Sequence, residues 1–359
     1  MFQKKEFLCL TLAAAALLLA CIAPSERPLP PSATDAAVRT EPPQTSVVVS
    51  IDATPAPSPT PVPTGTPSPS PSPTPAPTPV GLIGGRYDVF SPDGTPVWDD
   101  LSYRSDKVSI TITAYTYARG EEDNPYTDRS LAYFVADIYL QDLSSLRTAG
   151  SDDGFTGAKR ADIAEIAARV DALLAVNGDF FVGNNSTLII RNGVPYRLKT
   201  HPARDVCLLY RDGTVETCAG DALDLATLDT DAVWQGWEFG PYLIEADGEP
   251  RTEFPSSNIF TENPRTAFGY FEPGHYCFVV VDGRRSRYSM GLSLDALARL
   301  MADLGCKKAF NLDGGATSQL YWKDAVRSRP CGNRSQVDIL YLVEPVGDAA
   351  SPAEAKENP

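Results

Sequence analysis

The residues best suited to chemistry lie in one stretch, FNLDGGATSQLY, at positions 310–321. An apolar lead-in is followed by Asn311 and, two residues later, by Asp313. Side chains two apart in a strand project to the same face, so both are predicted to point to one side where a buried strand ends. The adjacent Gly314 and Gly315 would let the backbone approach a ligand or offer its N–H groups to an anion. The stretch therefore predicts a site built around a carboxylate.

Two other segments end in a similar way. Asn177 and Asp179 follow the apolar run ALLAV, and Asp282 follows the run HYCFVVV. An arginine-rich run begins two residues later, at Arg284. A single Asp-Gly is by itself a turn signal, and a short arginine run is either a solvated loop or an anion clamp. Three such strand ends in one chain nevertheless favour a functional site.

The elements that must position these residues follow one pattern twice, an amphipathic helix and then a short buried strand. Apolar residues recur at helical spacing over 163–170, ahead of the strand that ends at Asn177. In the second unit Ser293 is the predicted N-cap and Gly305 the predicted C-terminal cap of a helix with one apolar face. The strand that ends at Asn311 comes next.

The ends of the chain differ in composition from the rest. Residues 1–20 combine a basic start with an apolar run too short to span a bilayer comfortably, which predicts a signal peptide. The sequence LLAC ending at Cys21 is similar to the bacterial lipobox, in which this cysteine is lipidated; the alternative is an ordinary signal peptide with a chance cysteine. Residues 21–80 are rich in Pro, Ser and Thr and predict a disordered linker, and 347–359 predict a disordered tail. The folded domain is expected over 81–346.

Export and charge together limit the expected partners. A lipidated Cys21 would anchor the protein to the outer face of the bacterial cytoplasmic membrane, whereas without lipidation the protein would be secreted. The net charge of −15 argues against nucleic acid and anionic membrane surfaces as partners, because both reward clustered Lys and Arg. Contact with the membrane is therefore expected only through the lipid anchor.

The cysteines and histidines bear on disulfides and metals. Asp212-Gly213 predicts a two-residue hairpin whose register places Cys207 opposite Cys218, within disulfide range. Because an exported domain meets an oxidising compartment, we predict a Cys207–Cys218 disulfide. With two histidines in the chain and no CxxC pair, a zinc site is not expected. No cofactor is expected either, although the Asp-rich strand ends leave Ca²⁺ as an alternative.

A resemblance joins these segments. AVNGDFF, GPYLI, NPRTAFGY and VVDGRRSRYSMGLSLDALARLMADLGCKKAFNLDGGATS, in that order over about residues 171–343, resemble the phosphodiester glycosidase family. The resemblance implies a single α/β (α+β) domain, with a mixed β-sheet and packed helices, that removes N-acetylglucosamine from a sugar-1-phosphodiester. The family usually has Gly where Asp179 stands, and Gly-Ser or similar where Ala316-Thr317 stands. These departures leave the role of Asp179 and the sugar specificity open.

The reaction itself suggests a division of labour. Cleavage of the sugar C1–O bond expels a phosphate monoester, which hardly needs a general acid because its second pKa is near 6. The leaving group instead needs charge neutralisation, which the planar fork of arginine supplies, and a carboxylate must activate water or attack the anomeric carbon. Asp313 is the predicted nucleophile or base, with Asn311 orienting it or the sugar, and Asp282 is the competing carboxylate. Arg265 and Arg284 are the predicted phosphate binders.

The remaining candidates would complete the substrate site. The amides of Gly314 and Gly315 and the hydroxyls of Thr317 or Ser318 would bind the anion, and Asn177 a sugar hydroxyl, with Asp179 beside it. The predicted function is hydrolysis of an N-acetylglucosamine-1-phospho-glycan in the cell envelope or in an extracellular polysaccharide. The alternative is a non-catalytic glycan-binding module on a stalk, in which aromatic residues stack on sugars; its candidates are Trp234, Trp237, Tyr321 and Trp322.

Overall fold

The computed structural model describes residues 86–345, apart from residues 153, 156, 158, 183–185 and 255–259. The predicted signal peptide, Cys21, the linker over 21–80 and the tail over 347–359 lie outside the described residues. All described residues fall in one compact unit of the chain. Among them, no helix has the length and apolar character needed to cross a membrane.

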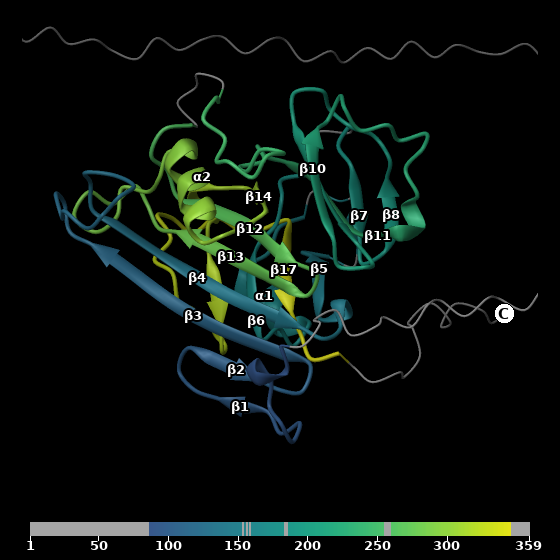
Figure 1. Ribbon diagram of the computed structural model, residues 1–359, viewed down its shortest axis with the longest axis horizontal. Coiled ribbons are helices and arrows are strands. Elements are labelled where there is room, and N and C mark those ends of the chain that lie inside the picture. The colour runs from purple at the N-terminus through teal and green to yellow at the C-terminus, as the bar shows by residue number, and fades with distance from the viewer. Residues whose placement is uncertain are drawn as a thin grey trace, which may run out of the picture. The chain divides into compact units, whose positions relative to one another are not determined.

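The described chain is built mainly from three β-sheets (Figure 1). The first sheet has seven strands, in the order β1 (Val97–Trp98), β2 (Ser102–Arg104), β3 (Val108–Tyr117), β4 (Leu131–Leu140), β13 (His275–Val281), β12 (Arg265–Glu272) and β14 (Lys308–Asn311). The second has five, in the order β10 (Val215–Ala219), β9 (Asp205–Tyr210), β11 (Val233–Phe239), β7 (Ile189–Arg191) and β8 (Val194–Arg197). The third also has five, in the order β16 (Ala325–Val326), β15 (Leu320–Trp322), β6 (Leu174–Asn177), β17 (Asp338–Leu342) and β5 (Leu146–Gly150).

The described helices are few and short. The α-helices are α1 (Ile163–Arg169) and α2 (Leu294–Asp303), and the 3₁₀ turns are η1 (Tyr87–Val89), η2 (Leu143–Ser145), η3 (Thr230–Ala232) and η5 (Gly315–Thr317). The caps of α2 are as predicted: the Ser293 hydroxyl accepts a hydrogen bond from the Ala296 N–H, and Gly305 has a left-handed φ of 87° just beyond the helix.

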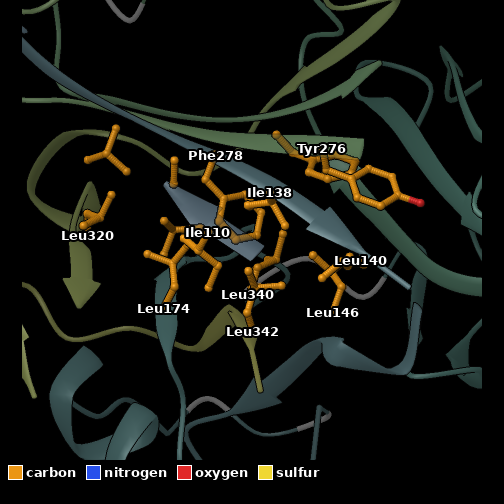
Figure 2. Close-up of a cluster of buried hydrophobic side chains, with 14 of the residues drawn as sticks. Ile110, Ile138, Leu140, Leu146, Leu174, Tyr276, Phe278, Leu320, Leu340 and Leu342 are labelled. Carbon is orange, nitrogen blue, oxygen red and sulfur yellow. The ribbon is translucent and has the colours of Figure 1, made fainter. Parts of the chain in front are cut away.

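The layers follow from the alternation of side chains along the strands. Val135, Val279 and Ala267 are register neighbours on β4, β13 and β12, and they share one apolar cluster with α2. Ala136, Phe278 and Phe268, one residue further along each strand, face the opposite way and join the main core. That core also contains Leu174, Leu320 and Leu340 of the third sheet, as Figure 2 shows. Alternate residues of the third sheet, such as Ala175 and Ile339, pack with α1 instead. The first and third sheets therefore pack face to face, and each carries one helix on its outer face.

The predicted mixed sheet with packed helices is only partly right, because the described fold is predominantly β. Both predicted helix-then-strand units exist, as β5–α1–β6 and β13–α2–β14. In each unit one strand is inserted between the two, β17 in the first and β12 in the second, and it pairs antiparallel with both. Every strand pairing among the described residues is consequently antiparallel.

The predicted Cys207–Cys218 disulfide is wrong, because both cysteines are free. The hairpin turns over three residues rather than two: the Gly213 N–H donates to Tyr210 O, and Gly213 has a φ of 84°. The register therefore slips by one, which pairs Cys207 with Thr217 and Cys218 with Val206. A slip of one residue sends side chains to opposite faces, so Cys207 lies in the main core and Cys218 packs in a separate cluster.

Candidate active site

Two of the predicted strand ends meet. β6 ends at Asn177 in the third sheet and β14 ends at Asn311 in the first. The Asn177 side-chain amide donates to the backbone oxygen of Asp313 at 2.7 Å, and the Asp313 N–H donates to Gly178 O at 3.2 Å. The Asn177 side-chain oxygen accepts from the Thr266 hydroxyl at 2.6 Å. Because Asn177 is buried and engaged in these contacts, it positions Asp313 and does not face a sugar, contrary to the prediction.

The Asp313 carboxylate lies just beyond β14, at the edge of the buried region. Its Oδ1 accepts from the Gly314 N–H at 2.9 Å and its Oδ2 from the Thr317 hydroxyl at 3.0 Å. Arg334 Nη2 lies 3.8 Å from Oδ2, and the Asp313 side chain keeps 15% of its surface exposed. Burial raises the pKa of Asp313 above its ordinary value, against the opposing effect of Arg334 and of hydrogen bonds from Thr317 and Gly314. The carboxylate is thus fixed in orientation and open on one side.

Within the described part of the chain, no hydrogen bond joins the Asn311 side chain to the Asp313 carboxylate. Its amide nitrogen donates to Gly240 O at 2.8 Å, and its Oδ1 has no hydrogen-bond partner among the described residues. The hydroxyl of Ser318 is buried and equally unpartnered in the described part of the chain. Thr317 is also buried, and its hydroxyl donates to Asp313 and to Gly314 O. The Thr317 hydroxyl is therefore engaged by Asp313 and Gly314 rather than by an anion. The Ser318 hydroxyl is buried.

The two glycines have a different role from the predicted one. The Gly314 N–H is engaged by Asp313, and the Gly315 N–H donates to Pro264 O at 3.0 Å, so neither amide is directed at an anion. Gly315 has a φ of 73°, in the left-handed region, and a Cβ placed there would lie 3.3 Å from the Arg284 guanidinium. These glycines therefore permit a tight turn and the close approach of an arginine.

The two predicted phosphate-binding arginines differ in exposure. Arg265 is buried, and its Nε and Nη2 donate to Leu292 O at 3.0 Å and Thr261 O at 2.7 Å. Burial, together with the nearby charge of Arg284, lowers the pKa of Arg265 to about 10. Arg284 is exposed and donates from Nε and Nη2 to Asn263 Oδ1 at 3.0 and 2.9 Å. Arg265 thus holds carbonyl groups of the chain, and Arg284 is the arginine of this pair that faces solvent.

Asp282 is a structural carboxylate in this arrangement. It is buried, and its two oxygens accept from the backbone N–H of Arg329 at 2.9 and 3.0 Å. Oδ2 also accepts from the Tyr288 hydroxyl at 2.9 Å. Among the described residues, no hydrogen bond or ion pair joins Asp282 to Asp313. The structure thus links Asp282 to two loops rather than to the Asn177–Asp313 contact.

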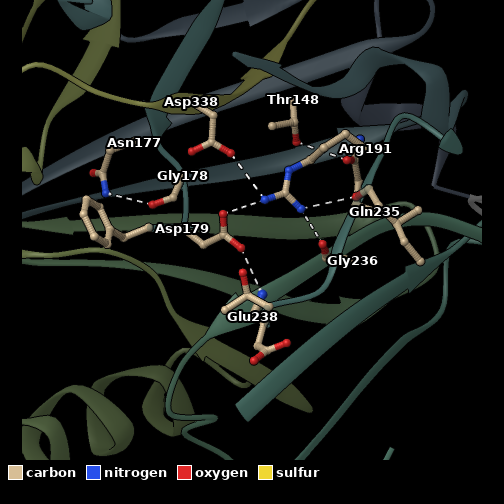
Figure 3. Close-up of polar contacts among 12 residues, drawn as sticks. Thr148, Asn177, Gly178, Asp179, Arg191, Gln235, Gly236, Glu238 and Asp338 are labelled. Carbon is tan, nitrogen blue, oxygen red and sulfur yellow. Dashed lines mark hydrogen bonds and ion pairs between the residues drawn. The ribbon is translucent and has the colours of Figure 1, made fainter. Parts of the chain in front are cut away.

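Asp179 belongs to a buried ionic cluster and not to an exposed sugar site (Figure 3). Its Oδ1 lies 2.5 Å from Arg191 Nη2, and its Oδ2 accepts from the Glu238 N–H at 2.9 Å. The same arginine nitrogen lies 3.4 Å from Asp338 Oδ2. Burial, and then the charge of Asp179, raises the pKa of Asp338 well above its usual range. The polar residue found where the family usually has glycine is therefore neutralised inside the fold.

Several residues near the site carry no signal in the sequence. Arg191 and Asp338 lie in ordinary strand patterns, and Arg160 and Arg334 lie in polar connecting segments. Arg160 and Arg334 both influence the pKa of Asp313, although they are distant from it in the chain. Within the described residues, no group of three or more His, Cys, Asp or Glu side chains is arranged to hold a metal ion.

The aromatic residues considered for sugar stacking are mostly core residues. Trp237, Trp322 and Tyr321 are buried, and half-buried Trp234 donates its indole N–H to Leu146 O at 2.7 Å. Buried rings cannot stack on a glycan. These four side chains therefore do not support the alternative of a non-catalytic glycan-binding module.

The match to known proteins covers the region that holds these strand ends. Residues 171–343 match the family model described as phosphodiester glycosidase. Among solved structures, the fold is similar to that of the catalytic domain of zebrafish N-acetylglucosamine-1-phosphodiester alpha-N-acetylglucosaminidase, auto-inhibited by its pro-peptide. That similarity has a TM-score of 0.53 at 19% identity and covers 66% of this chain and 83% of that one.

Two further matches are to an uncharacterized protein and to a hypothetical protein. The SPbeta prophage-derived uncharacterized protein YomE of Bacillus subtilis (strain 168) is 28% identical over 210 residues, which cover 55% of this chain. The match spans 32% of that relative, about a third of its length. A hypothetical protein from Synechocystis has a TM-score of 0.48 at 13% identity, covering 66% of this chain and 62% of that chain.

Proposed function

We propose that this domain hydrolyses the glycosidic bond of a sugar-1-phosphodiester and releases the free sugar and a phosphate monoester. The observation that carries the proposal is the Asp313 carboxylate. It is oriented by Gly314 and Thr317, lies 3.8 Å from an arginine and stands at the contact of two strand ends in the family-matched region. The family match supports the reaction class.

The proposed chemistry breaks the bond between the anomeric carbon and the phosphate oxygen. Water supplies the oxygen and one proton to the sugar, and the bonding electron pair leaves with the phosphate as a monoester. Asp313 either takes the proton from water or attacks the anomeric carbon first, and both routes require its ionised form. The leaving group gains negative charge as the bond breaks, so nearby guanidinium groups stabilise the transition state.

The substrate class follows from the family and from the predicted export of the chain. We infer that the sugar is of the N-acetylglucosamine type and that the phosphate links it to a cell-envelope or extracellular glycan. The basic and apolar start of residues 1–20 supports action outside the cytoplasm, and Cys21 supports attachment to the membrane through lipid.

The decisive experiment incubates the full-length protein with an α-N-acetylglucosaminyl-1-phospho-sugar diester and follows free N-acetylglucosamine and phosphomonoester together. Asp313→Asn should reduce kcat by about 10² to 10⁴-fold, because an amide can neither attack nor accept a proton. Its melting temperature should stay close to that of the wild type, because the amide oxygen can still accept the Gly314 N–H.

Asp282→Asn is the matched control. It leaves a buried acceptor pair incomplete and should lower stability by about 1–3 kcal/mol, while correctly folded enzyme retains most of its turnover. Retained turnover in Asp313→Asn, with turnover lost in folded Asp282→Asn, would transfer the role to Asp282. Release of neither product by the wild type would contradict the proposed reaction for this sugar.

A further inference from the structure

A second pair of arginines lies beside Asp313, gathered on one aromatic ring. Phe180 follows the buried Asp179 and is half-buried itself. The guanidinium carbons of Arg160 and Arg334 lie 5.0 Å and 5.4 Å from the centroid of its ring, within the range of cation–π contact. The segments that carry the two arginines are joined by paired backbone hydrogen bonds between Ala161 and Gln336. Two positive charges are thus held together against their mutual repulsion.

The position of the Phe180 ring is fixed by contacts of its own backbone and of the residues on either side of it. Asp179, immediately before Phe180, is buried in the ion pair with Arg191 that Figure 3 shows. The backbone oxygen of Phe180 accepts from Arg204 Nη1 at 3.2 Å. Phe181, the next residue, packs edge-on against Phe155 at 6.3 Å between ring centroids. The Phe180 ring is therefore anchored through the residues on both sides of it in the chain, and Arg160 on this ring is exposed.

The charges of this pair are not neutralised within the described chain. Arg160 is exposed and has no carboxylate within 4 Å among the described residues, and Arg334 meets Asp313 alone, at 3.8 Å. Guanidinium groups that lie over a ring use their planar face, which leaves the N–H edges for hydrogen bonds. Arg334 Nη2 lies 3.8 Å from the proposed catalytic carboxylate, and the charge of Arg160 also acts on that carboxylate, so an anion carried on the sugar would arrive near both arginines.

We propose that Arg160 and Arg334, held on Phe180, form the site that binds the phosphate of the substrate and of the phosphomonoester product. This assignment rests on the proposed function and differs from the predicted use of Arg265 and Arg284. Arg334 contacts both the carboxylate and the phosphate, so it couples the two ends of the bond that breaks. Arg160 supplies a second fork to an anion whose charge grows as the bond breaks.

The test uses the full-length protein and inorganic phosphate as the probe, with binding measured by calorimetry and by competitive inhibition of diester hydrolysis. Arg160→Gln and Arg334→Gln should each weaken phosphate binding by about tenfold or more. Arg334→Lys, which keeps the charge but not the fork, should lie between the wild type and Arg334→Gln. The matched control is Arg287→Gln, an exposed arginine of the neighbouring loop, which should bind phosphate as the wild type does.

The outcomes separate this inference from the proposed function. Phosphate binding that survives both glutamine variants but falls in Arg284→Gln would overturn the inference and place the anion on the other arginine pair. The absence of phosphate binding in the wild type would overturn it as well. Wild-type protein that binds phosphate through Arg160 and Arg334 but cleaves no diester would uphold the anion site and contradict the glycosidase reaction. Normal hydrolysis with unchanged KM in both Arg160→Gln and Arg334→Gln would contradict the anion site and uphold the glycosidase reaction.

Discussion

At the scale of single residues, two aspartates of similar sequence context have different surroundings. Asp313 keeps part of its carboxylate open beside Arg334, whereas Asp282 is 1% exposed and accepts two hydrogen bonds from one backbone N–H. Both follow an apolar strand and precede glycine, and burial raises the pKa of both. The two carboxylates differ in their access to solvent and substrate, and this difference favours Asp313 as the catalytic carboxylate.

The ionisation of Asp313 predicts the acid limb of the pH profile. The reaction needs the carboxylate, and burial raises its pKa above 3.8, so kcat/KM should fall on acidification at a higher pH than an ordinary aspartate would give. Arg334 opposes this rise, so Arg334→Gln should move the acid limb to still higher pH. The measurement is kcat/KM against pH for both proteins. An acid limb that Arg334→Gln leaves in place would contradict the assignment of the limb to Asp313.

Asp338 makes a prediction about stability. Its folded pKa is raised far above that of the unfolded chain, so the native state binds a proton more tightly than the unfolded state between these two values. The stability that this provides is complete below the unfolded pKa and is lost as the pH rises toward the folded pKa. Asp338→Asn cannot titrate, so as the pH rises above the ordinary aspartate value of 3.8 its melting temperature should decline less than that of the wild type. Parallel melting curves for the two proteins would refute this role.

At the scale of elements, the site arises where two helix-and-strand units face each other. β6 belongs to the third sheet and β14 to the first, and the main core lies between these sheets. The strand ends are joined by the hydrogen bonds from Asn177 to Asp313 and from Asp313 to Gly178. A carboxylate at the meeting point of two sheets is held by both, which restricts its motion relative to a residue on a free loop.

The turn after β14 depends on the left-handed conformation of Gly315, which leads to a prediction about stability. Gly315→Ala forces a side chain into a left-handed conformation and toward the Arg284 guanidinium, so it should destabilise the protein by about 1–2 kcal/mol. Gly332→Ala is the control, because a Cβ there meets Ala316 Cβ at an ordinary 3.5 Å. Denaturant unfolding of the two variants measures the difference. Equal stability of both variants would show that the turn relaxes without cost.

At the scale of the whole molecule, the cysteines report the packing of the layers. Cys207, Cys277 and Cys306 are buried in the cores on the two faces of the first sheet, whereas Cys218 and Cys331 are half-buried. Brief alkylation of the native full-length protein, followed by peptide mass spectrometry, should modify Cys218 and Cys331 ahead of the other three. A reduced and unfolded sample, in which all five of these cysteines react, is the control. Recovery of a peptide pair bridged between Cys207 and Cys218 would restore the two-residue hairpin register.

Local patterns were sufficient for much of the fold and for the central residue of the site. The amphipathic helix with Ser293 and Gly305 as caps is confirmed, because capping and periodicity act within a few residues of the chain. The strands that end at Asn177 and Asn311 are confirmed for the same reason. The ordered set of motifs over residues 171–343 was sufficient for the family, which the family model confirms.

The tertiary structure alone decided which polar residues face the site. Asn177, Asp179 and Asp282 differ little from Asp313 in local pattern, yet packing turns them inward to hydrogen-bond partners that are distant in the chain. A one-residue difference in a turn separated Cys207 from Cys218, since strand side chains alternate between faces. Arg160 and Arg334 became neighbours through pairing of segments that lie far apart in the chain. The sequence by itself determined the elements and the family, because these depend on local periodicity and ordered motifs; the contacts around Asp313 were decided by long-range packing.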